Sequence, residues 1–202
     1  MRTILTCLLL GLLAACADQQ AARAPAPDPY AALLADLRGG GYIIYLRHAE
    51  TATASEPTVR DLSDCSWQRN LNEHGREQAA IIGAKLREQG ITAGTLEASP
   101  FCRTRQTAEL VFGKAPVINV DLYYHVSQTL PEIAATDAKL KTRLSQRPPG
   151  GGNLVLVGHA PTMRDAAGVE LPEGQGAIVK PNGDGTFKVV ARLSVYGIAP
   201  GP

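Results

Sequence analysis

The sequence predicts an α/β fold, because strand-like and helix-like segments alternate along the chain. Two apolar runs, residues 41–48 and 153–159, have the composition of strands buried on both faces of a parallel sheet. Each run ends on a histidine, His48 in the first and His159 in the second. Ligands of open α/β sheets bind at the carboxyl ends of the strands. We therefore expect both histidines to serve chemistry at that edge of the sheet.

Segments with helical periodicity separate the expected strands. Residues 73–89 place small and apolar side chains near one face, and Gly90 ends this predicted helix. A short amphipathic helix is expected just before the three glycines at 39–41. Besides residues 73–89, the helices that we expect are residues 31–37, 104–112, 131–144 and 162–167.

The remaining strands are expected at residues 95–98, 116–120, 177–180 and 187–193. The last two flank Asn182-Gly183-Asp184-Gly185, a composition typical of a hairpin turn. The sheet is therefore expected to end in an antiparallel hairpin. Residues 50–70 show little periodicity, so we expect them to form a loop.

The N-terminal segment resembles an export signal. A short basic start is followed by an apolar stretch, residues 4–13, that is too short to span a membrane. The sequence Leu13-Ala14-Ala15-Cys16 then resembles the lipobox of bacterial lipoproteins, in which cleavage precedes a cysteine that is acylated. The alternative is an ordinary signal peptide. We expect a signal peptide over residues 1–15, an Ala/Pro-rich tether over 16–29 and one domain over 30–202.

These features predict an exported protein anchored by lipid on Cys16. Ala17, in place of an aspartate, resembles the sorting pattern for the outer membrane, so we expect the domain to face the periplasm. Without residues 1–15 the chain has 19 basic and 19 acidic residues, a balance that argues against nucleic-acid binding and against a polybasic membrane contact. Membrane attachment would come from the lipid alone.

Two cysteines remain once the signal peptide and the lipidated residue are set aside. An exported protein occupies an oxidising compartment, so Cys65 and Cys102 are expected to form a disulfide. The alternative is a pair of buried free thiols.

Four motifs resemble those of the histidine phosphatase superfamily, which has the phosphoglycerate mutase-like fold. Arg47-His48-Ala49-Glu50-Thr51 resembles its R-H-G-E-T signature. In the same order along the chain, the sequence also resembles the family's L-T-x-x-G-x-x-Q-A helix, its S-P-x-x-R-x-x-Q-T-A turn and its second G-H motif at residues 70–79, 99–108 and 158–160. The resemblance extends from residue 42 to the C-terminus and implies a three-layer α/β/α sandwich with a mostly parallel sheet.

The resemblance also implies a catalytic set. His48 would carry a phosphoryl group during hydrolysis of a phosphomonoester, and Arg47, Arg103 and His159 would form the phosphate pocket. Guanidiniums bind phosphate bidentately and stay charged, and a histidine attacks only from a neutral nitrogen. Beside the bound anion we expect His159 to be protonated and to donate to the transferring group. A small phosphorylated substrate is implied, without a metal or another cofactor.

Some assignments have competitors. Arg105 lies close to Arg103, but the spacing from the Ser-Pro pair favours Arg103. His74 and His125 lack motif support, and we expect them to be surface or helix-start residues. Ala49 replaces the usual glycine, a small change in size.

The proton donor to the leaving group is not identified by the motifs. Many relatives carry a glutamate in the segment that here spans residues 119–126, which contains none. Asp121, Glu50 and Glu132 are the candidates to replace it. Loss of this acid motivates a second hypothesis, a lipid-anchored protein of the same fold that binds phosphate ligands but is catalytically impaired. A third is a structural lipoprotein that reuses the fold. The motifs specify neither the substrate nor the oligomeric state.

Overall fold

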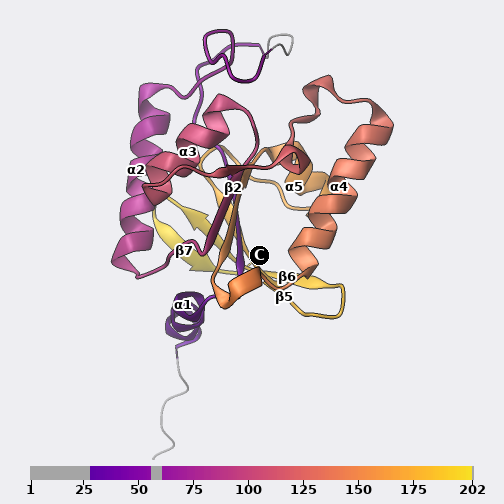
Figure 1. Cartoon of the computed structure of the whole chain (residues 1–202). Coiled ribbons are helices and arrows are strands. Elements are labelled where there is room, and N and C mark those ends of the chain that lie inside the picture. The colour runs from indigo at the N-terminus through magenta and orange to yellow at the C-terminus, as the bar shows by residue number, and fades with distance from the viewer. Residues whose placement is uncertain (1–27, 56–60, 202) are drawn as a thin grey trace, which may run out of the picture.

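A computed structural model describes residues 28–55 and 61–201 (Figure 1). The predicted signal peptide and the predicted lipidation site at Cys16 lie outside these residues, as does most of the Ala/Pro-rich tether. Within the described part of the chain, no helix combines the length and the apolar character that membrane spanning requires.

The strands of the described residues belong to one seven-stranded sheet, with the order β3-β2-β4-β1-β5-β6-β7. The first four strands in this order are mutually parallel, and the pairs on the other side of β1 are antiparallel. The strands are β1 (Ile43–Arg47), β2 (Thr95–Ala98), β3 (Val117–Ile118), β4 (Leu154–Gly158), β5 (Gly176–Pro181), β6 (Phe187–Ser194) and β7 (Gly197–Pro200). The expected β5–β6 hairpin is confirmed.

Two strands differ from the sequence prediction. β3 has only two residues, because the Asn119 side chain accepts a hydrogen bond from the Asp121 amide at 2.9 Å and starts a 3-10 turn. β7 was not predicted, because a four-residue segment with glycine at one end and proline at the other carries no alternation. It is a strand only because it pairs with β6. It lies at the sheet edge, where a proline is tolerated.

Helices cover both faces of the sheet, so the three-layer sandwich is confirmed. In Figure 1, α2 and α3 lie on one side of the sheet, while α4 and α5 lie on the other. The α-helices are α1 (Pro29–Gly39), α2 (Glu73–Glu88), α3 (Cys102–Phe112), α4 (Leu130–Ser145) and α5 (Ala160–Ala167). The 3-10 helices are η1 (Val120–Leu122), η2 (His125–Ser127) and η3 (Pro149–Gly151).

The alternation of side chains along β1 explains why this strand is apolar throughout. Ile44 and Leu46 pack in the core beneath α1, α2 and α3. Ile43 and Tyr45 pack in the separate core beneath α4 and α5. Successive side chains of a strand point to opposite faces, so a central strand covered on both sides needs apolar residues at every position.

The register between β1 and β4 brings the two motif histidines to the same edge. Arg47 pairs with Gly158, and the His48 amide donates to the Gly158 carbonyl at 3.1 Å. His48 and His159 therefore follow directly after paired residues on neighbouring parallel strands. α3, which carries Arg103, begins just beyond the carboxyl end of the adjacent strand β2.

The Tyr45 side chain binds the backbone of His159. Its fully buried hydroxyl donates to the His159 carbonyl at 2.8 Å and accepts from the His159 amide at 3.0 Å. A Cβ atom on Gly158 would collide with this hydroxyl. The glycine before His159 is therefore required by the close approach of the Tyr45 side chain.

We predict that Gly158→Ala lowers the free energy of unfolding by about 1–3 kcal/mol, because the added methyl group overpacks against Tyr45. Denaturant unfolding measures the change. Combining it with Tyr45→Phe should cost less than the sum of the two single changes, since the closest contact is removed. Gly39→Ala is the control, because a Cβ there meets no atom within 4 Å. Additive effects of the two substitutions would contradict the clash.

Candidate active site

The four residues predicted from the motifs converge at the carboxyl edge of the sheet. The ring centroids of His48 and His159 are 5.5 Å apart, and both residues are buried. The Phe101 ring lies 5.2 Å from the His159 ring, and the Arg103 guanidinium lies 4.6 Å from the centre of the same phenyl ring. Arg47, directly before His48, has a side chain that is 23% exposed, so it lines the accessible side of this cluster.

The two ring nitrogens of His48 are in different states. Its Nδ1 lies 2.9 Å from the Ala49 carbonyl oxygen, which can only accept, so Nδ1 carries the proton and Nε2 keeps its lone pair. Burial holds the pKa of His48 well below its ordinary value, and the nearby charge of Arg103 lowers it further. The ring is therefore neutral at physiological pH, the form in which Nε2 attacks an electrophile.

One ring nitrogen of His159 has a hydrogen-bond partner in the described part of the chain, and the other has none. Its Nε2 lies 2.9 Å from the Ser99 hydroxyl, and its Nδ1 is buried with no hydrogen bond among the described residues. The Tyr124 ring packs against it, with centroids 5.0 Å apart. Burial, followed by the charge of Arg103, lowers the pKa of His159 well below its ordinary value.

The predicted protonation of His159 concerns the ring beside a bound anion, whereas in the protein by itself the lowered pKa favours the neutral ring. Desolvation and a neighbouring guanidinium both disfavour the charged ring. A phosphate dianion beside the ring would act in the opposite direction and favour the protonated form.

Arg103 is the largest of the fully buried side chains. Its guanidinium lies 4.6 Å from the Phe101 ring centre and 5.3 Å from that of Tyr124, so two aromatic faces contribute to its surroundings. Its carbonyl accepts from Thr107 Oγ1 at 2.7 Å, and the same hydroxyl accepts from the Ala49 amide at 2.9 Å. α3 is thereby tied to the turn that follows His48.

Arg105, the competing arginine, lies elsewhere. Its Nη2 lies 2.9 Å from the Cys102 sulfur and 3.4 Å from the Cys65 sulfur. These two cysteines form a disulfide, with Cα atoms 5.8 Å apart, rather than a pair of free thiols. Gln68 adds a second link, because its side-chain oxygen accepts from the Cys102 amide at 2.9 Å.

The disulfide therefore connects the loop of residues 61–70 to the first residue of α3, next to Arg103. This loop lies above the carboxyl edge of the sheet at the top of Figure 1.

Glu173 and Arg69 are site residues that the sequence analysis missed. Glu173 Oε1 lies 3.3 Å from Arg47 Nη2 and 3.6 Å from Arg69 Nη2. The charge of Arg69 also lowers the pKa of His48 and of Arg47, after burial and closer charges. Neither residue belongs to a motif. Glu173 reaches the site because the segment before β5 returns beside β1, where the Gly174 amide donates to the His48 carbonyl at 2.9 Å.

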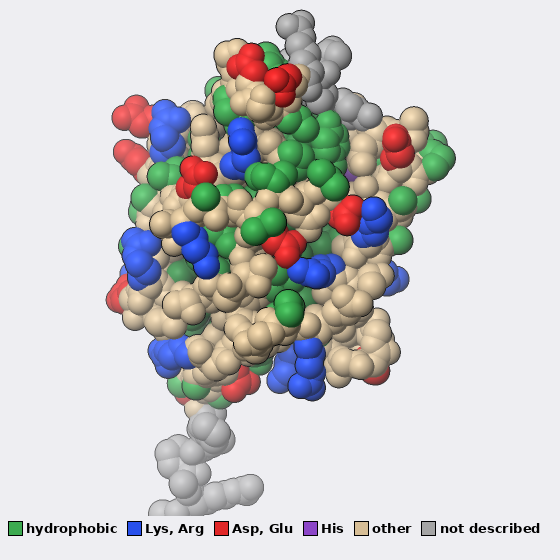
Figure 2. Space-filling model, in the orientation of Figure 1, with side chains coloured by type: hydrophobic (Ala, Val, Ile, Leu, Met, Phe, Trp, Pro, Cys, Tyr) green, Lys and Arg blue, Asp and Glu red, His purple; other side chains and the backbone are tan. Residues whose placement is uncertain are grey.

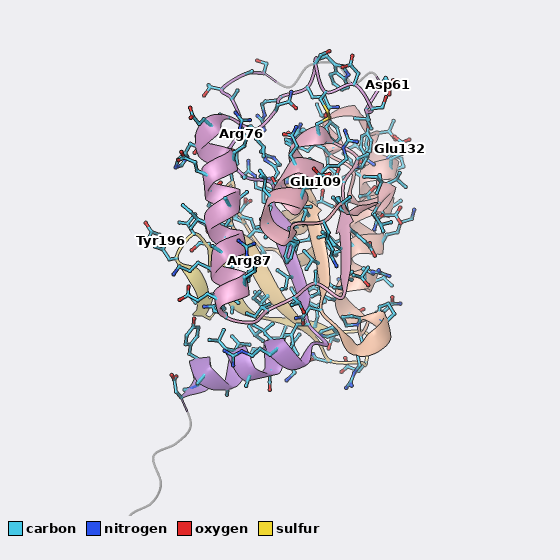
Figure 3. All side chains as sticks on the ribbon, turned by 60° about the vertical axis from the view of Figure 1, so that its left-hand side comes forward. Asp61, Arg76, Arg87, Glu109, Glu132 and Tyr196 are labelled. Atoms are coloured by element: carbon cyan, nitrogen blue, oxygen red, sulfur yellow. A yellow bond between two sulfur atoms is a disulfide. The ribbon has the colours of Figure 1, made fainter. Side chains whose placement is uncertain are left out.

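The three candidate proton donors are each held by other groups. Glu50 accepts hydrogen bonds from Asn72 at 2.7 Å and pairs with His74 at 2.8 Å. Asp121 pairs with a lysine of α4 at 2.7 Å. Glu132, labelled in Figure 3, caps the first turn of α4. Each of these three carboxylates therefore already has a partner outside the four motif residues.

The two remaining histidines differ from one another. His74 is exposed in the first turn of α2, as predicted. His125 begins η2, so the helix-start alternative holds for it, but its side chain is only 11% exposed and it is therefore not a surface residue. Its Nε2 lies 3.2 Å from Asp137 and its Nδ1 lies 3.6 Å from Asp165. Helices distant in sequence supply both acids, which is why no local pattern revealed this environment.

This trio is also the group of His, Cys, Asp and Glu side chains in the described residues that has the spacing for a metal ion. Each ring nitrogen of His125 faces a different carboxylate, which is the arrangement of an ion-pair cluster between η2, α4 and α5. On the face drawn in Figure 2, basic and acidic side chains are interspersed, in keeping with the balanced net charge.

A family model, the histidine phosphatase superfamily (branch 1), matches residues 43–143. The chain belongs to the histidine phosphatase superfamily. The matched region contains Arg47, His48 and Arg103 and ends before His159. The membership of His159 in the site therefore rests on its proximity to His48 in the structure.

Solved structures share the fold at low sequence identity. The protein histidine phosphatase SixA, complexed with tungstate, has 17% identity over 77% of this chain and 97% of its own, with a TM-score of 0.56. A mutant phosphoserine phosphatase from Entamoeba histolytica, in complex with phosphoserine, has 12% identity over 76% and 97%, with a TM-score of 0.56. A mycobacterial glucosyl-3-phosphoglycerate phosphatase has 15% identity over 74% and 97%, with a TM-score of 0.50. A comparison with curated proteins finds no match.

We predict that Cys65→Ser/Cys102→Ser lowers the free energy of unfolding by about 4 kcal/mol, because the crosslink closes a 37-residue separation in the unfolded chain. Guanidinium unfolding of the oxidised protein and the double variant measures the difference. Wild type treated with a reductant should match the double variant. Equal midpoints for the oxidised protein and the variant would contradict the crosslink.

Acid should destabilise the fold through the two buried histidines. Their pKa values are lowered in the folded state, so below about pH 6.5 the unfolded chain takes up protons that the folded protein excludes. The stability that the two neutral rings give to the folded protein is fully present above that pH and is lost as the pH falls. Between pH 7.5 and 5.5 we expect a loss of about 1 kcal/mol for each histidine.

Urea unfolding at the two pH values measures this loss. His48→Asn should reduce the pH dependence, because it removes one of the two buried rings. A His48→Asn protein with the pH dependence of wild type would rule out a buried neutral His48.

Proposed function

We propose that this protein hydrolyses phosphomonoesters through a covalent phosphohistidine on His48. The observation that supports this most directly is the state of that ring, which is buried and neutral and has its Nδ1 proton directed to the Ala49 carbonyl. Nε2 is thereby available next to Arg47 and Arg103. The substrate is a small phosphorylated molecule, and nothing in the balanced charge of the chain favours a nucleic acid.

In the first step, the Nε2 lone pair forms a bond to phosphorus while the bond from phosphorus to the leaving oxygen breaks. That oxygen keeps the electron pair and takes a proton from solvent water. In the second step, water attacks phosphorus, the P–N bond breaks, its electron pair returns to Nε2, and inorganic phosphate leaves. Arg47 and Arg103 neutralise the phosphoryl oxygens in both steps. His159 donates to the transferring group once the anion favours its protonated form.

In this proposal, none of the three candidate acids among the described residues protonates the leaving group. The three candidate acids are held by other groups, and a general acid typically contributes about 10²–10⁴ in rate. The preferred substrates in this proposal are therefore those with good leaving groups. Examples are aryl phosphates, which release a phenol, N-phosphoimidazoles, which release an imidazole, and phosphoanhydrides. One structural relative is named a protein histidine phosphatase, which fits an imidazole leaving group.

We further propose that the domain is exported and anchored to the outer membrane by lipid on Cys16, facing the periplasm. The sequence around Cys16 supports the anchor, and the Cys65–Cys102 disulfide suits an oxidising compartment.

His48→Ala should lower phosphate release from an aryl phosphate by at least about 10³-fold, because the nucleophile is removed. Wild type should form an acid-labile phosphoenzyme, detected by rapid acid quench and mass spectrometry, and the variant should not. His74→Ala is the matched control, since His74 is exposed on the first turn of α2. Turnover retained by His48→Ala would remove His48 from the mechanism.

The missing acid favours one other function, a phosphate-ligand binding protein without turnover. That alternative would be supported if wild type bound orthovanadate or inorganic phosphate but hydrolysed no aryl, sugar, nucleotide or amino-acid phosphate.

A further inference from the structure

We infer that Glu173 is a positioning residue whose carboxylate stabilises the positive charge that His48 gains when it accepts the phosphoryl group. The inference rests on the proposed function and adds a residue that lies outside the recognised motifs. Glu173 follows β4 and α5 and precedes β5.

The geometry places an anion on the far side of the nucleophile. Glu173 Oε1 lies 4.0 Å from His48 Nδ1, and Nε2 is the ring nitrogen left for phosphorus. Among the described residues, this is the carboxylate that lies within 4.0 Å of a His48 ring nitrogen. The Nδ1 proton is directed to the Ala49 carbonyl at 2.9 Å, so Glu173 acts on the ring through charge rather than as a proton acceptor.

The reaction changes the charge of this ring. When Nε2 bonds to phosphorus, the proton on Nδ1 stays, and the neutral imidazole becomes a positively charged N-phosphoryl imidazolium. The charge disappears when water breaks the P–N bond. Arg103, Arg47 and Arg69 all disfavour a positive charge on His48, and burial disfavours it further. An anion that is shielded from water and close to Nδ1 opposes this effect.

Glu173 is held firmly enough to serve this purpose. Its carboxylate accepts from the Thr51 amide at 3.2 Å, from the Thr51 hydroxyl at 3.0 Å and from Arg47 Nη2 at 3.3 Å. Its carbonyl accepts from the Gln78 side chain at 3.2 Å. The side chain is 22% exposed, so water screens its charge only in part. The arrangement is preorganised, because these contacts exist before substrate binds.

The same contacts allow a purely structural role, in which Glu173 only tethers Thr51 and Arg47. The two roles differ in what they do to anion binding. A tether that is lost would disorder Arg47 and weaken both phosphate binding and turnover. Loss of the charge alone would slow phosphorylation of His48 but would not weaken phosphate binding, because a negative group has been removed from an anion site.

The test compares Glu173→Gln with wild type in the full folded protein. We expect kcat for an aryl phosphate, and the single-turnover rate of phosphoenzyme formation, to fall about 10- to 100-fold. The dissociation constant for inorganic phosphate should stay the same or decrease. Glu173→Asp keeps the charge on a shorter side chain and should retain more activity than Glu173→Gln.

Two controls separate charge from structure. Glu170→Gln removes a carboxylate from the same segment, where the side chain is 68% exposed, and should behave like wild type. Thr51→Val removes the hydroxyl contact but leaves the Glu173 charge, and should keep kcat within a few-fold of wild type. Thermal unfolding of each variant verifies that it is folded.

The inference is overturned if Glu173→Gln retains wild-type kcat, if its kcat and phosphate affinity fall together, if Thr51→Val reproduces its defect, or if Glu173→Asp is equally impaired. In these cases wild type still forms a phosphoenzyme, and the proposed function stands. Wild type that forms no phosphoenzyme and turns over no substrate would instead overturn the proposed function, and this inference with it.

Discussion

The parallel pairing of β1 with β4 is the constraint on which the site depends. Its register sets Arg47 opposite Gly158, so two histidines distant in sequence leave the sheet side by side. Tyr45 reinforces the arrangement from within β1, because its buried hydroxyl binds both the amide and the carbonyl of His159. Apolar side chains on both faces of these strands make the pairing rigid, so the imidazoles need no flexible loop to meet.

A second constraint is electrostatic. The site gathers guanidiniums around two buried rings, and burial together with this positive charge lowers the pKa of both rings and keeps them neutral. The positive charges of such a cluster repel one another unless negative groups lie among them. The Glu173 carboxylate lies within 4 Å of Arg47 and Arg69, and the rings of Phe101 and Tyr124 lie beside the buried Arg103, so each of these cations has favourable surroundings without a ligand.

The local patterns predicted most of the helices and strands but not their full surroundings. The helix predicted at residues 73–89 is observed as Glu73–Glu88. It could be predicted because its periodic apolar face and the glycine that ends it can be recognised from residues close together in sequence. β7 escaped prediction, since only its pairing with β6 makes it a strand. The burial of His125 escaped prediction for a similar reason, because the acids that face it come from α4 and α5.

The sequence by itself determined the fold class, the family and the four motif residues, because apolar periodicity and motif spacing are written along the chain. Tertiary structure decided which arginine joins the site, that the two cysteines are close enough to bond, and that Glu173 lies beside His48. These facts depend on strand order and on the path of loops between distant segments. Burial, which sets the charge of both histidines, likewise exists only once the sheet and its two helical layers have assembled.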